Sequence, residues 1–400
     1  MKKTVSIIGG GPCALMLGAE LDHQKYRVRI YEKNNTLGRK FLVAGDGGLN
    51  LTHSESPEIF LTRYTPSNFI ARAFHHFSNL DFIKWLNNSG IETFVGSSKR
   101  VFPKKGIKPI QVLELLAHKV FKNETEVFYK HEWIGFSESK ELLFNTAQKQ
   151  ITISSDIVIF CLGGASWPVT GSTGSWLQIF RNLGINVNDF QASNCSYKIS
   201  WPEGLISSIE GKALKNIITS CNGVKHYGEV VLTRFGIEGS GIYPLGPQIR
   251  KQLQEQKEAR VFIDLKPSVP IEKIEDKIRN KPTRSSLSSW LAEELKLNKT
   301  MISLLKWLLS KDEFLDTEKL AETIKNLPIL VSGFGPIEDA ISTVGGINLD
   351  ELNENFELLK RPGIYAIGEM LDYDAPTGGY LLQSCFSMGK YLADYLNKKG

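Results

Sequence analysis

A glycine-rich segment near residue 10, followed at a fixed distance by an acid, has the spacing of a dinucleotide-binding turn. The segment reads Gly9-Gly10-Gly11-Pro12-Cys13-Ala14. Gly9 permits a tight turn, Gly11 lets the backbone approach a pyrophosphate, and the small Ala14 stands where helix and strand pack closely. Glu32 follows Ala14 by 18 residues and can accept hydrogen bonds from ribose hydroxyls. Because an acid here disfavours a 2′-phosphate, the pattern predicts FAD or NAD rather than NADP.

The elements around this turn are a strand, a helix and a second strand. Residues 4–8 are β-branched and apolar, as in a buried parallel strand. Residues 15–21 are apolar enough for a helix, whose N-terminus would hold the pyrophosphate through free N–H groups and its dipole. Residues 26–32 predict a second strand that ends in the acid. This order is typical of a Rossmann-type βαβ unit.

Two later segments repeat the pattern of an apolar strand that ends in glycine. Residues 156–162 lead into a glycine pair, and residues 363–367 lead into glycine and glutamate. Such glycines offer unhindered backbone N–H groups, and the acid can hold a sugar-like hydroxyl. A helix expected over residues 381–397 would direct its N-terminal dipole at a bound cofactor. We therefore predict that segments from both ends of the chain build one cofactor domain.

The residues that follow Glu32 resemble a known group of flavoproteins. Leu37-Gly38-Arg39-Lys40 and then Gly45-Asp46-Gly47-Gly48-Leu49-Asn50 are similar to the glutathione-reductase-like FAD superfamily. More narrowly, the chain resembles bacterial NAD(P)/FAD-dependent oxidoreductases of the aminoacetone-oxidase-like or bile-acid-reductase type. The resemblance continues at 163–174, 232–241, 342–346 and 377–380 and extends from residue 5 to residue 389. The family's arginine and cysteine before the asparagine are absent, so no role of that cysteine transfers.

The resemblance implies FAD as the cofactor, with NAD(P)H as a transient electron donor. The expected cofactor-binding residues come from the glycine turns, their acids and the positions that match the family. They are Gly9, Gly11, Pro12, Cys13, Ala14, Glu32, Lys33, Arg39, Lys40, Gly48, Asn50, Gly163, Gly164, Gly368, Glu369, Asp372, Gly379, Tyr380 and Leu381.

We predict an α/β fold in which a Rossmann-like FAD-binding domain carries an insertion. Residues 1–190 and 343–400 form the FAD-binding domain. Residues 191–269 have short alternating runs separated by glycine and proline, which predict a β-rich, barrel-like substrate domain. Residues 270–342 have apolar residues at helical spacing, which predict a small helical cap and the return of the chain.

We expect an FAD-dependent oxidoreductase that reduces an activated C=C bond, because flavin supplies hydride or single-electron chemistry. A second dinucleotide turn and a CxxC pair are absent, which excludes the reaction of glutathione reductase. Reduction of a C=C bond also needs a proton donor, and His53 and Tyr380 are the candidates, with simple packing as the alternative. Two other functions stay open: an RNA uracil reductase that forms dihydrouridine, and a flavoprotein with structural or sensory FAD.

The charge of the chain is weakly basic in total and concentrated in one place. Its 48 basic and 43 acidic residues give +5, too little to indicate nucleic acid on its own. Five basic residues stand within ten positions around Phe102, and a phosphate of NADPH or RNA could bind there, although a solvated loop has the same composition. They are Lys99, Arg100, Lys104, Lys105 and Lys108.

Cysteine spacing and hydropathy bear on metals, membranes and location. The five cysteines form no CxxC pair, so we expect neither a metal site nor a disulfide framework. The apolar run at residues 4–8 is too short for a secretion signal, and no stretch approaches the roughly 20 apolar residues of a membrane span. We expect a cytoplasmic protein that acts on a small-molecule substrate without a membrane, with RNA as a second partner to test.

Overall fold

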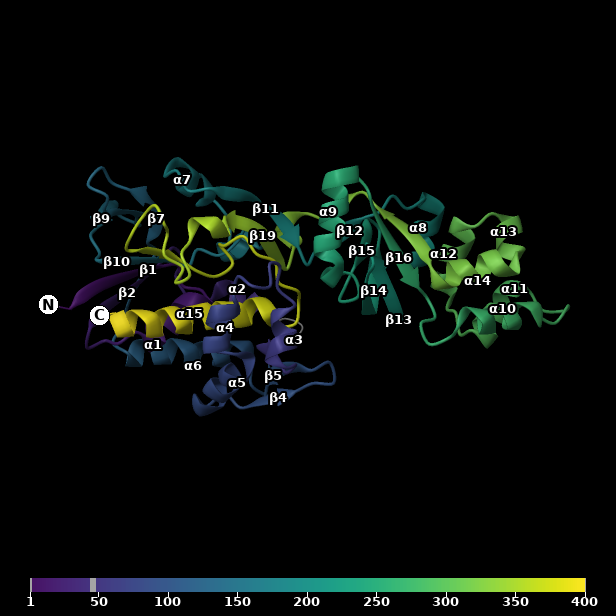
Figure 1. The fold of residues 1–400 in the computed structure, drawn as a ribbon, viewed down its shortest axis with the longest axis horizontal. Coiled ribbons are helices and arrows are strands. Elements are labelled where there is room, and N and C mark those ends of the chain that lie inside the picture. The colour runs from purple at the N-terminus through teal and green to yellow at the C-terminus, as the bar shows by residue number, and fades with distance from the viewer. Residues whose placement is uncertain (1, 44–47, 400) are drawn as a thin grey trace. The chain divides into compact units, whose positions relative to one another are not determined.

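The computed structural model describes residues 2–43 and 48–399. The chain divides into two compact units, and each has its own hydrophobic core. The first unit consists of residues 1–193 and 337–400, and the inserted unit consists of residues 194–336. Figure 1 labels many of the helices and strands of both units.

A five-stranded parallel sheet forms the centre of the first unit, in the order β20-β10-β1-β2-β6. These strands are β1 (Lys3–Ile8), β2 (Tyr26–Glu32), β6 (Glu126–Tyr129), β10 (Ile157–Phe160) and β20 (Ile364–Ala366). Val5, Ile7 and Ile8 of β1 are buried, as the sequence pattern requires of a strand covered on both faces. The predicted α/β fold with a Rossmann-like sheet from both ends of the chain is confirmed.

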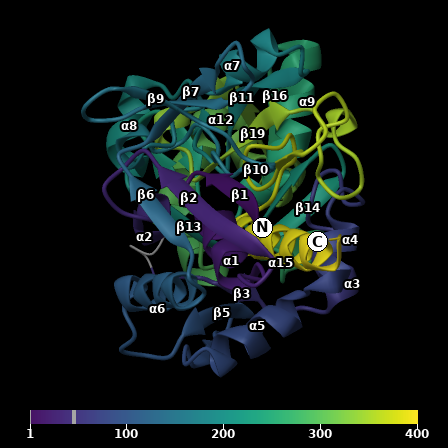
Figure 2. The same cartoon turned by 90° about the vertical axis from the view of Figure 1, so that its left-hand side faces the viewer.

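Three helices pack together beside this sheet: α1 (Pro12–Glu20), α6 (Pro109–Lys122) and α15 (Tyr380–Lys399) (Figure 2). The α1–α15 contact depends on a residue without a side chain. A Cβ atom at Gly389 of α15 would lie 2.9 Å from the Cβ of Met16 and 3.0 Å from the carbonyl oxygen of Cys13. Glycine therefore lets the last helix lie directly against the first.

Shorter elements surround the parallel sheet of the first unit. Three small antiparallel sheets are β3-β5-β4 (Thr52–His53, Arg100–Pro103, Thr93–Val95), β7-β8-β9 (Glu132–Phe136, Leu142–Asn145, Gln150–Ile153) and β11-β19 (Val187–Ser193, Ser342–Ile347). The remaining α-helices are α2 (Arg39–Val43), α3 (Pro57–Leu61), α4 (Ala71–His76), α5 (Asn79–Asn88) and α7 (Leu177–Asn182).

The inserted unit contains a seven-stranded sheet in the order β17-β16-β13-β14-β15-β12-β18. The strands are β12 (Tyr197–Lys198), β13 (Lys212–Cys221), β14 (Val224–Thr233), β15 (Gly236–Glu238), β16 (Ala259–Asp264), β17 (Leu327–Val331) and β18 (Gly333–Phe334). The hairpin from β13 to β14 turns at Asn222 and Gly223, which both have positive φ, as a two-residue turn of the mirror-image type requires.

Helices complete the inserted unit. They are α8 (Glu203–Ile209), α9 (Gly246–Gln256), α10 (Ile271–Arg279), α11 (Leu287–Glu294), α12 (Lys299–Leu308), α13 (Lys311–Leu315) and α14 (Thr317–Lys325). Ser286, Asn298, Ser310 and Asp316 cap the last four, because each side chain accepts a hydrogen bond from a backbone N–H in the first turn. These caps explain why four short helices follow one another with little chain between them.

Candidate dinucleotide site

A cavity opens in the first unit where β1, β2, β10 and β20 end, the usual ligand site of an open parallel sheet. It contains about 1070 Å³ of free space, including its opening to solvent. Eleven of the residues predicted from the sequence line it. They are Gly9, Gly11, Pro12, Cys13, Glu32, Lys33, Arg39, Lys40, Gly163, Gly368 and Glu369.

The turn after β1 contains Gly9 and Gly11, the two glycines to which the sequence pattern assigns separate roles. Gly9 has a φ of +103°, and a Cβ atom there would overlap the carbonyl oxygen of Cys161, so only glycine fits. Gly11 has ordinary backbone angles, φ −81° and ψ −172°, and a Cβ atom there would meet no atom within 4 Å. The space beside Gly11 is therefore free for a ligand, and α1 begins at the next residue. This geometry fits a pyrophosphate at the helix N-terminus.

Glu32 is buried at the end of β2 and fixes the glycine turn. Its Oε2 accepts a hydrogen bond of 2.7 Å from the Gly10 N–H, and its Oε1 accepts bonds of 2.7 Å from the backbone and side chain of Asn34. Arg39 in turn donates to Asn34 Oδ1 at 2.9 Å. The acid thus organises the rim of the cavity, in addition to the ribose contact that its position predicts.

An ion pair across the cavity joins α2 to the turn after β20. The Lys40 ammonium donates to both carboxylate oxygens of Glu369, at 2.9 and 2.8 Å, and to Ser166 Oγ at 2.8 Å. Glu369 is only 9% exposed and also accepts the Thr343 N–H at 3.2 Å. The sequence predicted Lys40 and Glu369 as separate cofactor residues but not their ion pair. It did not predict Ser166 as a partner of Lys40 or Thr343 as a partner of Glu369.

Three thiols lie at the cavity wall: Cys13, Cys161 and Cys385. Burial raises the pKa of the Cys13 and Cys161 thiols well above the ordinary value, so both are neutral at pH 7. Only the first of the three was predicted, because it stands inside the glycine motif. Within residues 2–43 and 48–399, no group of three or more His, Cys, Asp or Glu side chains is arranged to hold a metal ion.

The other predicted cofactor residues do not line this cavity. They are Ala14, Gly48, Asn50, Gly164, Asp372, Gly379, Tyr380 and Leu381. Ala14 is buried within α1, and Gly379 packs against the backbone of Thr52. Asp372 accepts a hydrogen bond from the Asn188 side chain at 2.5 Å. Residues 45–47 of the predicted glycine cluster lie outside the described residues.

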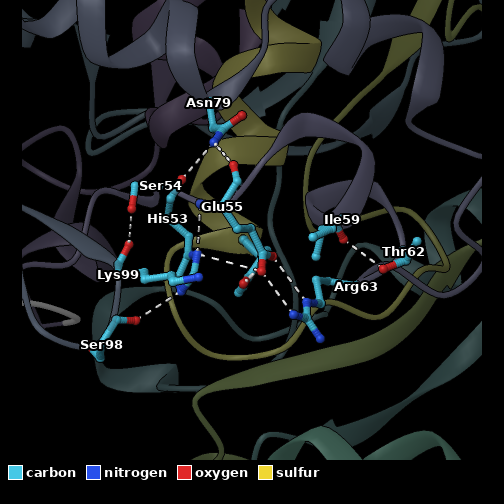
Figure 3. Close-up of polar contacts among 10 residues, drawn as sticks. His53, Ser54, Glu55, Ile59, Thr62, Arg63, Asn79, Ser98 and Lys99 are labelled. Atoms are coloured by element: carbon cyan, nitrogen blue, oxygen red, sulfur yellow. Dashed lines mark hydrogen bonds and ion pairs between the residues drawn. The ribbon is translucent and has the colours of Figure 1, made fainter.

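Tyr380 and His53, the candidate proton donors, belong to one polar cluster around Glu55. The Tyr380 hydroxyl donates to Glu55 Oε1 at 2.6 Å. Arg63 donates to both oxygens of that carboxylate, at 3.1 and 2.9 Å (Figure 3). Burial and the bond to Glu55 raise the pKa of the Tyr380 phenol. Burial alone would raise the pKa of Glu55 as well, but the hydrogen bonds from Arg63 and Tyr380 outweigh it, and that pKa is lowered.

The His53 ring is held on both sides. Its Nε2 lies 3.1 Å from the carbonyl oxygen of Ser98, and its Nδ1 accepts the Glu55 N–H at 3.3 Å (Figure 3). The ring stacks on Tyr380 with 5.4 Å between centroids. Burial lowers the pKa of His53 despite the attraction of the nearby carboxylate. The polar hydrogens of both candidates are therefore engaged within the cluster. Glu55 and Arg63 were not predicted, and their only signal is proximity in sequence to His53.

The basic segment of residues 99–108 adjoins this cluster through the small sheet β3-β5-β4. Arg100 on β5 is the register partner of His53 on β3. Phe94 on β4 stacks on Phe102 with 5.7 Å between centroids and remains 47% exposed. Lys104 pairs with Glu92 at 2.7 Å, so it is partly neutralised.

The parallel sheet, the glycine turn and the cavity define a Rossmann-type dinucleotide-binding protein. The family model described as "HI0933-like protein Rossmann domain" matches residues 3–395, so the chain belongs to this family. The predicted resemblance is thereby confirmed. The protein is an FAD-dependent oxidoreductase, and FAD is its cofactor.

Curated relatives match over nearly their full length. A "Ribosomal RNA dihydrouridine synthase" from Escherichia coli K12 is 25% identical over 393 residues, covering 95% of this chain and 94% of the relative. A "3-dehydro-bile acid delta(4,6)-reductase" from Clostridium scindens is 22% identical over 414 residues, covering 97% of each chain.

Solved structures agree in fold. A 3-ketosteroid-delta4-(5alpha)-dehydrogenase from Rhodococcus jostii RHA1 has a TM-score of 0.50 at 12% identity, covering 98% of this chain and 96% of that one. The quinol fumarate reductase FrdA of E. coli has a TM-score of 0.52 at 14% identity, covering all of this chain and 70% of that one. Within the described residues, no helix has the length and apolar character needed to cross a membrane.

Proposed function

We propose that the protein uses FAD to reduce a C=C bond conjugated to a carbonyl group. The observation that carries this proposal is the chemistry shared by the names of its full-length relatives. A dihydrouridine differs from uridine by hydrogen added across a ring C=C bond beside a carbonyl, and a delta(4,6)-reductase acts on C=C bonds. A small molecule with a conjugated enone is the substrate class that we put first.

The chain's own residues have distinct tasks in this proposal. Once reduced by NAD(P)H, bound FAD would supply the hydride. The backbone of the turn at Gly9 and Gly11, with the N-terminus of α1, holds the pyrophosphate, and Glu32 accepts from ribose hydroxyls. The Lys40–Glu369 pair fixes two walls of the cavity in place, since each side chain is anchored by the other. NAD(P)H is the proposed electron donor.

The reduction also requires a proton, and we keep His53 and Tyr380 as candidate donors. Tyr380 is held protonated at neutral pH, because its ionisation would place a phenolate beside the Glu55 carboxylate. Glu55 and Arg63 would act as positioning residues that fix the phenol. To act as the proton donor, either residue must break its present hydrogen bond and form one to the substrate.

An anaerobic half-reaction experiment tests the function. The bound flavin is reduced with NADH or NADPH, and its reoxidation is then followed by absorbance after addition of a steroid enone, a quinone or a uridine-containing RNA. We expect faster reoxidation by a substrate with a conjugated C=C bond, with the saturated product identified by mass. Reoxidation by oxygen alone would refute the proposal. Flavin that no donor reduces would instead favour structural or sensory FAD.

A second candidate function, reduction of uracil in RNA, draws support from the surface beside His53. There the exposed ring of Phe94 stacks on Phe102 of the basic segment, and an exposed ring next to a basic segment suits single-stranded RNA. Lys99 and Lys105 are exposed, and Lys104 is paired with Glu92. Changing Lys99 and Lys105 to Gln should weaken RNA binding. It should also reduce the slope of the logarithm of the binding constant against the logarithm of the salt concentration by about 1.4. An unchanged slope would count against this candidate.

A further inference from the structure

A hollow in the inserted unit is lined by three lysines. Lys215 comes from β13, Lys266 from the loop after β16, and Lys296 from the loop before α12. The hollow has about 1300 Å³ of free space, including its opening to solvent, and no carboxylate is among the described residues that line it. Three like charges around one space repel each other unless an anion lies between them.

Among the described residues, two of these ammonium groups form no ion pair, although the Asp264 carboxylate, itself paired with Lys325, accepts the backbone N–H of Lys266 at 2.9 Å. Throughout the described chain, neither Lys266 nor Lys296 takes part in an ion pair, and Lys215 lies 4.0 Å from Glu229, at the limit of such contact. Lys266 is half-buried, and burial lowers its pKa. The ammonium groups of Lys266 and Lys296 are therefore available to a ligand.

The polar groups beside the lysines also present donors. Lys215 and Asn216 stand at an irregularity in the pairing of β13 with β14, where the local backbone departs from the regular alternation of side chains. Tyr227 donates from its hydroxyl to Asn216 Oδ1 at 3.1 Å, so the acceptor of that amide is used and its NH₂ group remains. The positive end of α12, a helix of ten residues, adds to the same potential.

An exposed aromatic ring completes the hollow. Tyr227 is 60% exposed, and its hydroxyl bond to Asn216 holds the ring at the rim. A flat ring beside cationic donors suits a ligand that has both a planar base and a phosphate. A second hollow of the same unit has the opposite character, since six carboxylates and one lysine line it, so the charges of this unit are segregated.

We propose that this lysine-lined hollow is a binding site for nucleotide phosphate, with Lys215, Lys266 and Lys296 contacting the phosphate and Tyr227 contacting the base. The phosphate can belong to single-stranded RNA or to a free nucleotide. The site does not depend on the proposed reductase activity, and only its RNA form rests on the second candidate function.

The test uses the FAD-loaded full chain with two probes, a fluorescent ten-residue uridine RNA and UMP. The double variant Lys266→Gln with Lys296→Gln should weaken RNA binding on the order of tenfold and reduce the salt slope by about 1.4. The matched control, Lys251→Gln with Lys319→Gln, removes the same charge from exposed lysines of this unit that lie beside glutamates, and it should change neither value.

Comparing the two probes separates the sources of the phosphate, and Tyr227→Leu tests the contact with the base. If RNA is the ligand, this variant weakens RNA binding, while UMP binds weakly to every form. If a free nucleotide is the ligand, UMP binding is lost in the double lysine variant and RNA gains nothing over UMP. Unchanged binding of both probes in the double lysine variant, or an equal loss in the control, overturns the proposal. FAD content and melting temperature, measured in each variant, show that the fold and the cofactor site are intact.

Discussion

Gly11→Ala should separate folding of the first unit from binding of FAD. At Gly11 the backbone angles suit alanine, and the added methyl group meets no protein atom within 4 Å. Alanine also lowers the entropy of the unfolded chain, which stabilises by about 0.4–1 kcal/mol and raises the melting temperature of the apoprotein by about 1–4 °C. The methyl group would, however, occupy the space in which the pyrophosphate approaches the backbone. Losing one charge-assisted hydrogen bond of about 1.5–3 kcal/mol weakens FAD about 10- to 150-fold.

Two measurements check this prediction. The ratio of flavin to protein absorbance gives the FAD content after purification, and calorimetric titration of the apoprotein gives the dissociation constant. Gly9→Ala is the control, because its Cβ atom would overlap the Cys161 carbonyl oxygen at a φ of +103°, so the apoprotein itself should melt at lower temperature. Wild-type affinity in Gly11→Ala, or a loss of apoprotein stability, would refute the assignment of this cavity to the pyrophosphate.

Three further predictions concern stability. Glu55→Gln should lower the free energy of unfolding at pH 7 by about 1–3 kcal/mol, because the donors to Glu55 lose a charged acceptor. Folding lowers the pKa of Glu55, so the stability that its carboxylate contributes is full above the ordinary pKa of 4.5 and is lost as the pH falls through the lower folded pKa. Urea unfolding of wild type and Glu55→Gln should therefore show a smaller stability difference at pH 3 than at pH 7. An equal difference at both pH values would contradict this prediction. Lys40→Met should lower stability by about 2–3 kcal/mol, because Glu369 is left buried without its cation, and adding Glu369→Gln should restore part of the loss, whereas additive losses would argue against coupling. Gly389→Ala should cost about 1–3 kcal/mol by separating α15 from α1, and an unchanged melting temperature would show that the helices adjust.

Features set by neighbouring residues were predictable from the sequence. The turn from β1 into α1 depends on glycines at fixed spacing, and the place of Glu32 depends on the length of one helix and one strand. Both are local rules, so they could be read without knowing the rest of the fold. The same holds for β10 and β20, which end shortly before Gly163 and Gly368, since an apolar run followed by glycine is a signal within ten residues.

Pairings between distant segments could not be predicted in this way. Lys40 and Glu369 are 329 positions apart, and Glu55 and Tyr380 are 325 apart. Their partners are determined by how α2 and α15 lie on the sheet, which depends on packing of the whole unit rather than on any local pattern. The carboxylate that engages Tyr380 was therefore missed, although the tyrosine itself was found.

The order of strands in the first unit has a consequence for synthesis on the ribosome. β1 is made first but pairs with β10, and β20 and α15 are made last. The inserted unit, residues 194–336, is continuous and can bury its own core while the first unit still lacks residues 337–400. Until residues 337–400 have been made, the apolar face of α1 that α15 covers stays exposed. The wall of the dinucleotide cavity that Gly368 and Glu369 form does not yet exist. Nascent chains paused before residue 337 should therefore recruit chaperones through α1 and retain no flavin.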